Sequence, residues 1–287
     1  MKYLILLLNI LLLAGCTAEK KADHECPGTC SRKTHELLHA NLWMQTSAEY
    51  TAVCMQTYGT AQALLPVALA DASWTACIEQ GEDYATLPPA IVLDVDETVL
   101  DNTAFESRLI LTNDHYRKEN WIPWCNEAKA PAMAGVKEFL VKADELGVAI
   151  FYLTNRGSEV EEATRENLIK EGLPFDTEGD HLLTKGEKED WGSDKGSRRK
   201  YIAESHRVIM LFGDNFNDFA PETQVSPEAR VDLAVSYADR WGTKWFMLPN
   251  PDYGDWEAAF YGYKWPETDK EQLEIKYKAL KTLEAKQ

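Results

Sequence analysis

Four short apolar runs stand out along the chain, at residues 90–93, 148–153, 208–212 and 245–248. Each run is apolar throughout and is followed by polar residues, glycine or proline. This pattern is typical of a short strand that is buried on both faces. The chain is therefore expected to contain a sheet with no solvent-exposed face.

Helical patterns separate these runs. Apolar side chains recur at helical spacing over residues 131–146, and Gly147 is expected to end that helix. Ser158 and Glu161 have the spacing of a capping box, which predicts a second helix that ends near Gly172. Buried strands that alternate with helices predict an α/β fold: a doubly wound, Rossmann-type parallel sheet with helices on both faces.

The segments around this core are also helical in pattern. One apolar stripe is expected near the start, made of Leu37, Leu38, Leu42 and Trp43. A break in the following helix is expected at Pro66. The predicted domain spans 35–287, and its parts are N-terminal helices at 35–82, an α/β core at 88–260 with a small cap insertion at about 99–130, and a C-terminal helix at 268–287.

The first residues have the pattern of a targeting segment. Met1-Lys2 precedes an apolar run of about a dozen residues that ends Leu13-Ala14-Gly15-Cys16. Because a bilayer span takes about 20 residues, residues 1–15 are predicted to be a secretion signal, with a short buried element as the alternative. The four residues Leu13-Ala14-Gly15-Cys16 resemble a bacterial lipobox. This resemblance implies cleavage before Cys16, lipidation of its thiol, a tether at 16–34, and an outer-membrane lipoprotein of the bacterial cell envelope.

Five further cysteines follow, at Cys26, Cys30, Cys54, Cys77 and Cys125. Export permits disulfides, but an odd number leaves at least one thiol without a partner in its own chain. We expect a short disulfide loop between the first two, with a metal site as the alternative, and a bridge between Cys54 and Cys77 that joins two helices. Sequence alone does not determine the pairing.

Composition and charge exclude two classes of protein. The chain has 287 residues, of which 45% are apolar, and this content is too high for a disordered protein. Its 47 acidic and 30 basic residues give a formal charge of −17, which argues against a protein that binds nucleic-acid polymers. A local pocket for a phosphate group remains compatible with this charge.

Polar residues follow three of the predicted strands. Asp94 and Asp96 follow the first strand, residues 154–156 (Thr-Asn-Arg) follow the second, and Asp214 and Asp218 follow the third. In an open α/β sheet, ligands bind just outside the carboxyl ends of the strands. We therefore expect these side chains to converge on one crevice.

This set of side chains favours phosphoryl transfer assisted by a metal ion. Clustered carboxylates such as Asp94, Asp96 and Asp214 do not all stay ionised without a cation, and hard oxygen ligands at this density suit Mg²⁺. Once a metal and a lysine neutralise the phosphate, one carboxylate can attack it to form an aspartyl-phosphate. The second carboxylate can protonate the leaving oxygen and later deprotonate the attacking water.

Four ordered motifs resemble those of a known enzyme family. They are DVDETVLDN at residues 94–102, LTNR at 153–156, DKG at 194–196 and GDNFND at 213–218, and the segment LPNPDYG at 248–254 fits the same pattern. Together they resemble the class C acid phosphatases, the lipoprotein e(P4) branch of the haloacid dehalogenase superfamily. The resemblance covers roughly residues 85–260, and the lipobox fits the same branch.

The resemblance implies a role for each matching residue. Asp94 is implied as the nucleophile and a Mg²⁺ ligand, and Asp214 as a further metal ligand. Asp96 is implied as the general acid and base, with its backbone carbonyl on the metal. Thr154 and Asn155 are implied to hold the phosphoryl oxygens.

Two further residues support this set. Lys195 is implied to neutralise charge between the phosphate and the nucleophile, and its rivals nearby are Lys185, Lys188 and Lys200. Asp218 is implied to orient that lysine or a metal-bound water, with a helix cap as the alternative. Arg156 is either a surface charge or a phosphate clamp.

Aromatic residues suggest the substrate. Trp121 and Trp124 lie in the insertion, and Tyr253 follows the last strand. Aromatic faces beside a phosphate site can stack on a nucleobase, and the same family uses such a cleft for nucleoside monophosphates. The alternative is that these rings pack the insertion onto the core. Cys125, next to Trp124, is then a thiol that is either buried or reactive.

We therefore expect an exported, lipid-anchored, Mg²⁺-dependent phosphomonoesterase, an acid phosphatase with 5′-nucleotidase activity. One alternative is a phosphotransferase that passes the phosphoryl group to an alcohol. The other is a non-catalytic surface lipoprotein that keeps the fold for binding. Small α/β enzymes often pair, so a homodimer is plausible, although no residue pattern indicates it.

Overall fold

A computed structural model of the chain describes residues 34–281. The chain divides into a unit at Met1–Thr34 and a unit at His35–Gln287, and the account below concerns the second. The predicted signal peptide, the lipidated Cys16 and the Cys26–Cys30 loop lie outside the described residues. No helix among residues 34–281 is long and apolar enough to cross a membrane.

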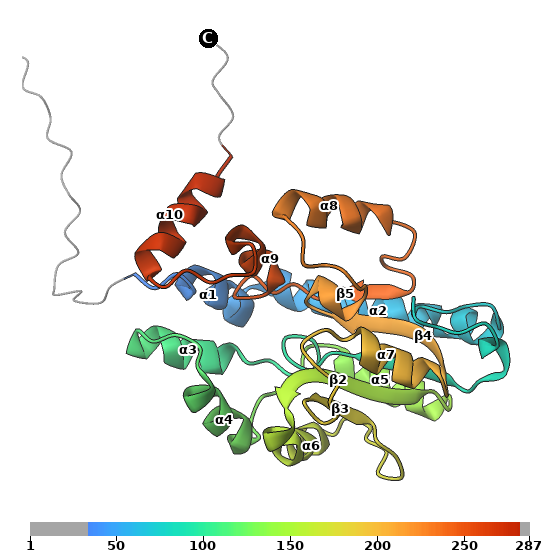
Figure 1. Cartoon of the computed structure of the whole chain (residues 1–287). Helices are drawn as coiled ribbons and strands as arrows, with labels where there is room; N and C mark the ends of the chain where they lie inside the picture. Colours follow the sequence, from blue (N-terminus) through green and yellow to red (C-terminus); the bar gives the residue numbers. More distant parts are fainter. Residues whose placement is uncertain (1–33, 282–287) are drawn as a thin grey trace, which may run out of the picture. The chain divides into compact units, whose positions relative to one another are not determined.

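The second unit is built on a five-stranded parallel sheet with the order β3-β2-β1-β4-β5 (Figure 1). The strands are β1 (Pro89–Leu93), β2 (Ala149–Gly157), β3 (Leu182–Lys185), β4 (Arg207–Gly213) and β5 (Trp245–Met247). The predicted doubly wound α/β fold is confirmed. Strand β3 is missing from the sequence prediction because only two of its four residues are apolar, and such a short edge strand leaves almost no periodicity.

Helices cover both faces of this sheet. On one face lie α2 (Ala48–Ala70), α5 (Val136–Glu145) and α6 (Glu161–Lys170), packed over Ile91 and Leu93 of β1. On the other face lies α7 (Gly196–Ala203), packed over Ala90 and Val92. Successive side chains of β1 enter opposite cores. Both faces of the strand are therefore buried, which explains why its apolar run is unbroken.

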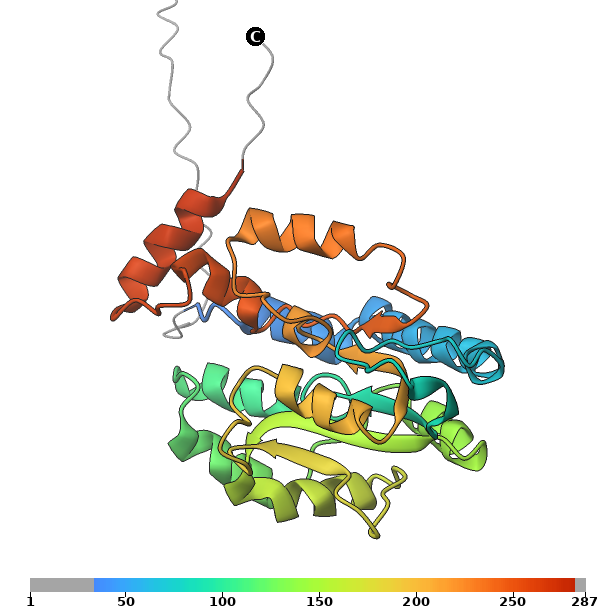
Figure 2. The same cartoon turned by 45° about the vertical axis from the view of Figure 1, so that its right-hand side comes forward.

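The remaining helices flank this core. They are α1 (Leu38–Thr46), α3 (Thr103–Thr112), α4 (Lys118–Glu127), α8 (Pro227–Ser236), α9 (Asp255–Ala258) and α10 (Asp269–Ala279), with short 3₁₀ turns at Tyr84–Thr86, Ser158–Val160, Phe216–Asp218 and Ala259–Tyr261. The predicted insertion folds into α3 and α4. In both views the strand arrowheads point toward these two helices, so the insertion stands at the carboxyl ends of the strands (Figures 1 and 2).

The predicted break at Pro66 is wrong, because α2 continues through it. Pro66 is exposed, so water can reach the carbonyl that the proline leaves without a backbone donor. Its neighbours Ala61, Leu65 and Ala68 are fully buried. Burial of the leucine alone is worth about 1.5–3 kcal/mol, which offsets the roughly 3 kcal/mol cost of an internal proline.

The predicted stripe on α1 is also wrong, since Leu38, Leu42 and Trp43 are exposed. The helix instead buries Asn41 and Met44. The amide of Asn41 donates to the Thr103 carbonyl at 3.2 Å and to the Ser107 hydroxyl at 2.9 Å. Polar bonds to α3, which periodicity does not show, therefore set the rotation of α1.

Two smaller predictions fail for local reasons. Ser158 lies inside a 3₁₀ turn that precedes α6, so it does not cap the helix. The disulfide between Cys54 and Cys77 does not form, and both thiols are free and buried. Cys54 lies in the core on one face of the sheet and Cys77 in the core on the other, so the sheet separates them.

Candidate active site

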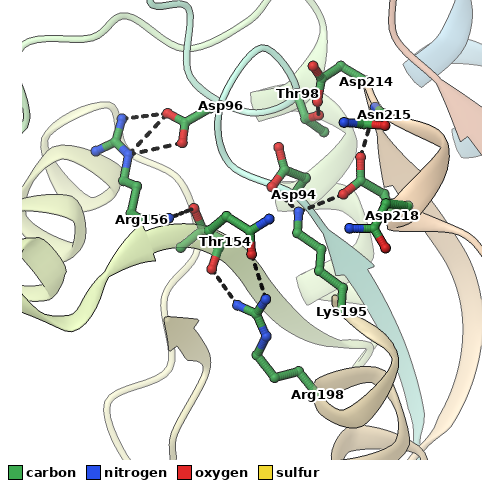
Figure 3. Close-up of polar contacts among 12 residues, drawn as sticks. Asp94, Asp96, Thr98, Thr154, Arg156, Lys195, Arg198, Asp214, Asn215 and Asp218 are labelled. Atoms are coloured by element: carbon green, nitrogen blue, oxygen red, sulfur yellow. Dashed lines mark hydrogen bonds and ion pairs between the residues drawn. The ribbon is translucent and has the colours of Figure 1, made fainter. Parts of the chain in front are cut away.

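The carboxyl ends of three strands bring the predicted site residues together (Figure 3). Asp94 directly follows β1, Thr154 lies toward the end of β2, and Asp214 directly follows β4. Strand β1 pairs with both β2 and β4, which explains why these three positions lie side by side. These side chains therefore converge at the edge of the sheet where the sequence predicts a ligand-binding crevice.

Lys195, at the N-terminus of α7, is the lysine that reaches the site. Its ammonium donates to Asp94 and, at 2.6 Å, to Asp218 (Figure 3). Burial lowers the pKa of Lys195, but the carboxylates of Asp218 and Asp94 outweigh burial and raise it above its ordinary value. The lysine is therefore a fixed positive charge beside Asp94.

The rival lysines are engaged elsewhere. Lys185 donates to the Ser193 hydroxyl at 2.6 Å, and the ammonium of Lys188 lies over the rings of Trp191 and Tyr201. Lys200 is exposed on α7. Of the four candidates, only Lys195 contacts an aspartate of the crevice.

The carboxylates of Asp94, Asp214 and Asp218 form an acidic triad, with one oxygen from each within 4.8 Å of the others. Asp214 accepts from the Asn250 amide at 2.8 Å and from Thr98 at 3.5 Å, and no cationic side chain pairs with it among the described residues. Burial raises the pKa of Asp214 well above its ordinary value, and the charges of Asp94 and Asp218 raise it further. Three clustered carboxylates, of which those of Asp94 and Asp218 are buried, lie beside a single lysine and fit a divalent cation, which would keep all of them ionised.

Asp218 differs from the other two members of the triad because both of its oxygens already accept protein donors. One oxygen accepts from Lys195, and the other accepts from the Asn215 N–H at 2.9 Å within a capping box. The two sequence interpretations of Asp218, lysine orientation and capping, therefore hold together. A Cβ at Gly213 would overlap the Asp218 side chain, which explains the glycine at that position.

The Asp96 carboxylate is directed toward Arg156 (Figure 3). Nε and Nη2 of Arg156 donate to Asp96 Oδ1 at 3.0 and 2.8 Å, and Asn102 donates to the same oxygen at 2.8 Å. The Arg156 side chain is only 1% exposed, so its interpretation as a surface charge is wrong. Its donors are directed at protein groups, which also disfavours a direct phosphate clamp.

The phosphate-binding candidates on β2 are positioned by α7. The Thr154 hydroxyl oxygen accepts from the Arg156 backbone N–H at 3.0 Å. The Asn155 side chain accepts from Arg198 at 2.6 Å and donates to the Ser193 carbonyl at 3.1 Å, so its amide is engaged within the protein. Thr154 therefore retains a hydroxyl proton for a ligand, while Asn155 contributes chiefly by fixing the strand end.

Sequence reasoning missed Arg198 and Asn102. Arg198 is fully buried and donates to the carbonyl of Thr154, and burial lowers its pKa to about 10. Its position one turn after Lys195 on α7 was the available indication. Asn102 connects Asp96 to the insertion, because its Oδ1 accepts from Trp124 Nε1 at 2.8 Å.

The aromatic candidates have different surroundings. Trp124 is buried and hydrogen-bonded, which favours packing over stacking on a ligand. Trp121 is partly buried, packs edge-on against Phe105 at 4.9 Å between ring centroids, and has Arg156 over its ring at 5.4 Å. Tyr253 is partly exposed. Cys125 is buried and burial raises its pKa to about 12, so it is an unreactive thiol.

Comparison with known proteins identifies the family of the chain. The family model described as HAD superfamily, subfamily IIIB (acid phosphatase), matches residues 13–256. The chain belongs to this family of acid phosphatases. Its family and structural neighbours make it a phosphomonoesterase of the class C type, as the sequence motifs predicted.

Solved structures and a curated relative extend the comparison. The class C acid phosphatase from Bacillus anthracis is 35% identical with a TM-score of 0.76, and the match covers 86% of this chain and 97% of that one. Its structure with tungstate bound gives the same values. Acid phosphatase 1 from Solanum lycopersicum is 26% identical over 167 residues, which span 56% of this chain and 57% of the plant protein.

Proposed function

We propose that the protein is an exported, lipid-anchored, Mg²⁺-dependent phosphomonoesterase that acts through an aspartyl-phosphate and prefers nucleoside monophosphates. One observation supports the chemistry above all others. Lys195 bridges Asp94 and Asp218 at the crevice where Asp214 completes the acidic triad. A nucleophilic carboxylate, a fixed positive charge and a cation site are thereby assembled at one point.

In the first half-reaction, a carboxylate oxygen of Asp94 attacks the phosphorus, and the bond from phosphorus to the leaving oxygen breaks. Lys195 and the Thr154 hydroxyl bind the phosphoryl oxygens, whose negative charge would otherwise repel the nucleophile. Asp96 gives its proton to the leaving oxygen, so the product departs as an alcohol. A Mg²⁺ ion held by Asp94, Asp214 and the Asp96 backbone carbonyl would neutralise the transferred phosphoryl group.

In the second half-reaction, a water molecule attacks the phosphorus of the aspartyl-phosphate. Asp96, now ionised, takes the proton from that water, and the bond between phosphorus and Asp94 breaks. Inorganic phosphate leaves and both aspartates return to their starting protonation states. Asp218 takes no proton in this scheme, because its bonds to Lys195 and Asn215 assign it to holding the lysine.

Two further parts of the proposal concern the substrate and the membrane anchor. Trp121 and Tyr253, both partly exposed, are proposed to stack on the base of a nucleoside monophosphate. The apolar run and the lipobox-like Leu13-Ala14-Gly15-Cys16 support export and anchoring at the outer membrane through a lipid on Cys16. Globomycin-sensitive processing and metabolic lipid labelling of Cys16 would test the anchor.

The decisive experiment measures phosphate release from 5′- and 3′-nucleotides, sugar phosphates and an aryl phosphate. The conditions are Mg²⁺, EDTA, and the isosteric Asp94→Asn variant with Mg²⁺. Turnover that requires Mg²⁺ and disappears in the variant is expected. Activity that survives Asp94→Asn would refute the nucleophile, and transfer to an added alcohol would identify a phosphotransferase. Complete inactivity of the wild type would instead favour the non-catalytic alternative.

A further inference from the structure

The Asp96 carboxylate accepts hydrogen bonds from both Arg156 and Asn102. Arg156 Nε donates to Asp96 Oδ1 at 3.0 Å and lies 3.3 Å from Oδ2, and Nη2 donates to Oδ1 at 2.8 Å. Asn102 Nδ2 adds a third donor to Oδ1 at 2.8 Å. The two oxygens of Asp96 are therefore not equivalent, because Oδ1 accepts three donors while Oδ2 accepts only the longest bond.

This asymmetry identifies the oxygen that exchanges a proton. Oδ1 is occupied by protein donors, whereas Oδ2 can carry the proton that is donated to a leaving oxygen and can later accept a proton from a water. The Asp96 side chain is 18% exposed, so a ligand in the crevice can reach it. Figure 3 shows the Asp96 carboxylate held on the Arg156 side of the crevice, apart from the pair formed by Asp94 and Lys195.

The Arg156 guanidinium also contacts three other side chains. Nη1 donates to the Thr164 hydroxyl at 3.1 Å, and Nη2 lies 3.4 Å from Asn102 Oδ1. The ring of Trp121 covers its face at 5.4 Å. Burial lowers the pKa of Arg156, but the Asp96 carboxylate outweighs it, so the guanidinium stays charged. A planar guanidinium that is held in this way fixes the orientation of the carboxylate it contacts, whereas the point charge of a lysine does not.

We propose that Arg156 is a positioning residue that directs Oδ2 of Asp96 at the leaving-group oxygen and joins this carboxyl to the aromatic insertion. The proposal rests on the proposed function, in which Asp96 is the general acid. Arg156 makes no contact with substrate in this role. It selects which oxygen of Asp96 faces the scissile bond, beside the Trp121 ring at which the leaving group is expected to lie.

The test exploits the dependence of acid catalysis on the leaving group. Nitrophenolate departs without a proton, whereas the alkoxide of adenosine 5′-monophosphate needs one. We expect Arg156→Met to lower kcat/KM for adenosine 5′-monophosphate by about 100-fold and for 4-nitrophenyl phosphate by less than about 10-fold. kcat/KM is the appropriate quantity because it reports the steps up to phosphoryl transfer to Asp94. It does not include the later attack of water, which is common to both substrates. Arg156→Lys keeps the positive charge but lacks the planar guanidinium. Its ratio of the two kcat/KM values is expected to lie between those of the wild type and of Arg156→Met.

Two controls separate positioning from a structural effect. Arg207 is also buried, but it donates to the carbonyls of Ala68, Asp71 and Trp74 at the opposite end of β4. Arg207→Met should destabilise the fold and leave the ratio of the two kcat/KM values unchanged. In an Asp96→Asn background, Arg156→Lys should have no further effect on that ratio, since the carboxyl that it positions is absent.

The outcomes are distinct. Equal losses for both substrates in Arg156→Met and Arg156→Lys would overturn the proposal and assign Arg156 a purely structural role. So would a change in the ratio that persists in the Asp96→Asn background. Failure of the proposed function would look different, because wild-type turnover would then be absent or would survive Asp94→Asn. If Arg156→Met does not fold, the Arg156→Lys ratio decides.

Discussion

A buried pair of acidic residues should make the stability of this protein fall as the pH rises. Asp252 is 3% exposed, and neither of its carboxylate oxygens has a hydrogen-bond partner among the described residues. Burial raises its pKa to about 7, and the charge of Asp101 adds to the effect. Burial likewise raises the pKa of Glu106 on α3 to about 8, and the charge of Asp252 contributes.

The direction of the effect follows from proton binding. Between about pH 4 and pH 8 the folded protein holds protons on these carboxyls that the unfolded chain has already lost. The stability that the protonated Asp252 and Glu106 contribute is therefore fully present below the ordinary carboxyl pKa, and this contribution is lost as the pH rises through 7 to 8. A rise of about three pKa units for Asp252 corresponds to roughly 4 kcal/mol.

Asp252→Asn removes this loss because the amide never ionises. We expect the variant to exceed the wild type in free energy of unfolding by roughly 3–4 kcal/mol at pH 8, and to match it within about 1 kcal/mol at pH 4.5. Urea denaturation at the two pH values measures the difference. Asp239→Asn, at an exposed aspartate, is the control and should change stability equally at both. A difference between Asp252→Asn and wild type that does not depend on pH would refute the reasoning.

Three further predictions test other parts of the structure. Lys195→Met should lower phosphate release at least 100-fold, measured at a pH where the variant is shown to be folded by circular dichroism, and Lys185→Met should not. Gly213→Ala should destabilise the fold by about 1–3 kcal/mol in urea, because the new Cβ meets the Asp218 side chain. Pro66→Ala should stabilise it by about 1–2 kcal/mol, since the exposed turn of α2 regains a hydrogen bond, and an unchanged denaturation midpoint would contradict this.

The sheet could be predicted from the sequence because its central strands are continuous apolar runs. Strands β1 and β4 are buried on both faces, so every position in them is apolar or tightly packed. The carboxyl ends of these strands then located Asp94 and Asp214 without any structure. The short strand β3 at the sheet edge lacks such a pattern, and long-range contacts rather than local periodicity fix it.

The failures share a physical cause, which is that tertiary contacts outweighed local preference. Pro66 is tolerated in α2 because its helix packs on α5, and α1 turns toward α3 through Asn41. Neither contact leaves a trace in the sequence near the residue it affects. The separation of Cys54 from Cys77 by the sheet is likewise visible only once the chain connections are known.

Asn102 shows why the surroundings of Asp96 were harder to predict than those of Asp94. The surroundings of Asp94 depend on residues at strand ends, whose neighbours are set by parallel pairing. The surroundings of Asp96 depend on Asn102, which donates to Asp96 and accepts from the Trp124 ring of the insertion. Its backbone N–H also donates at 2.7 Å to Glu97, a buried residue with a left-handed backbone at φ 54°. The strained turn at Glu97 and the inserted helix that carries Trp124 both bond to Asn102, so changes in the insertion can reach the Asp96 carboxylate without altering Asp94.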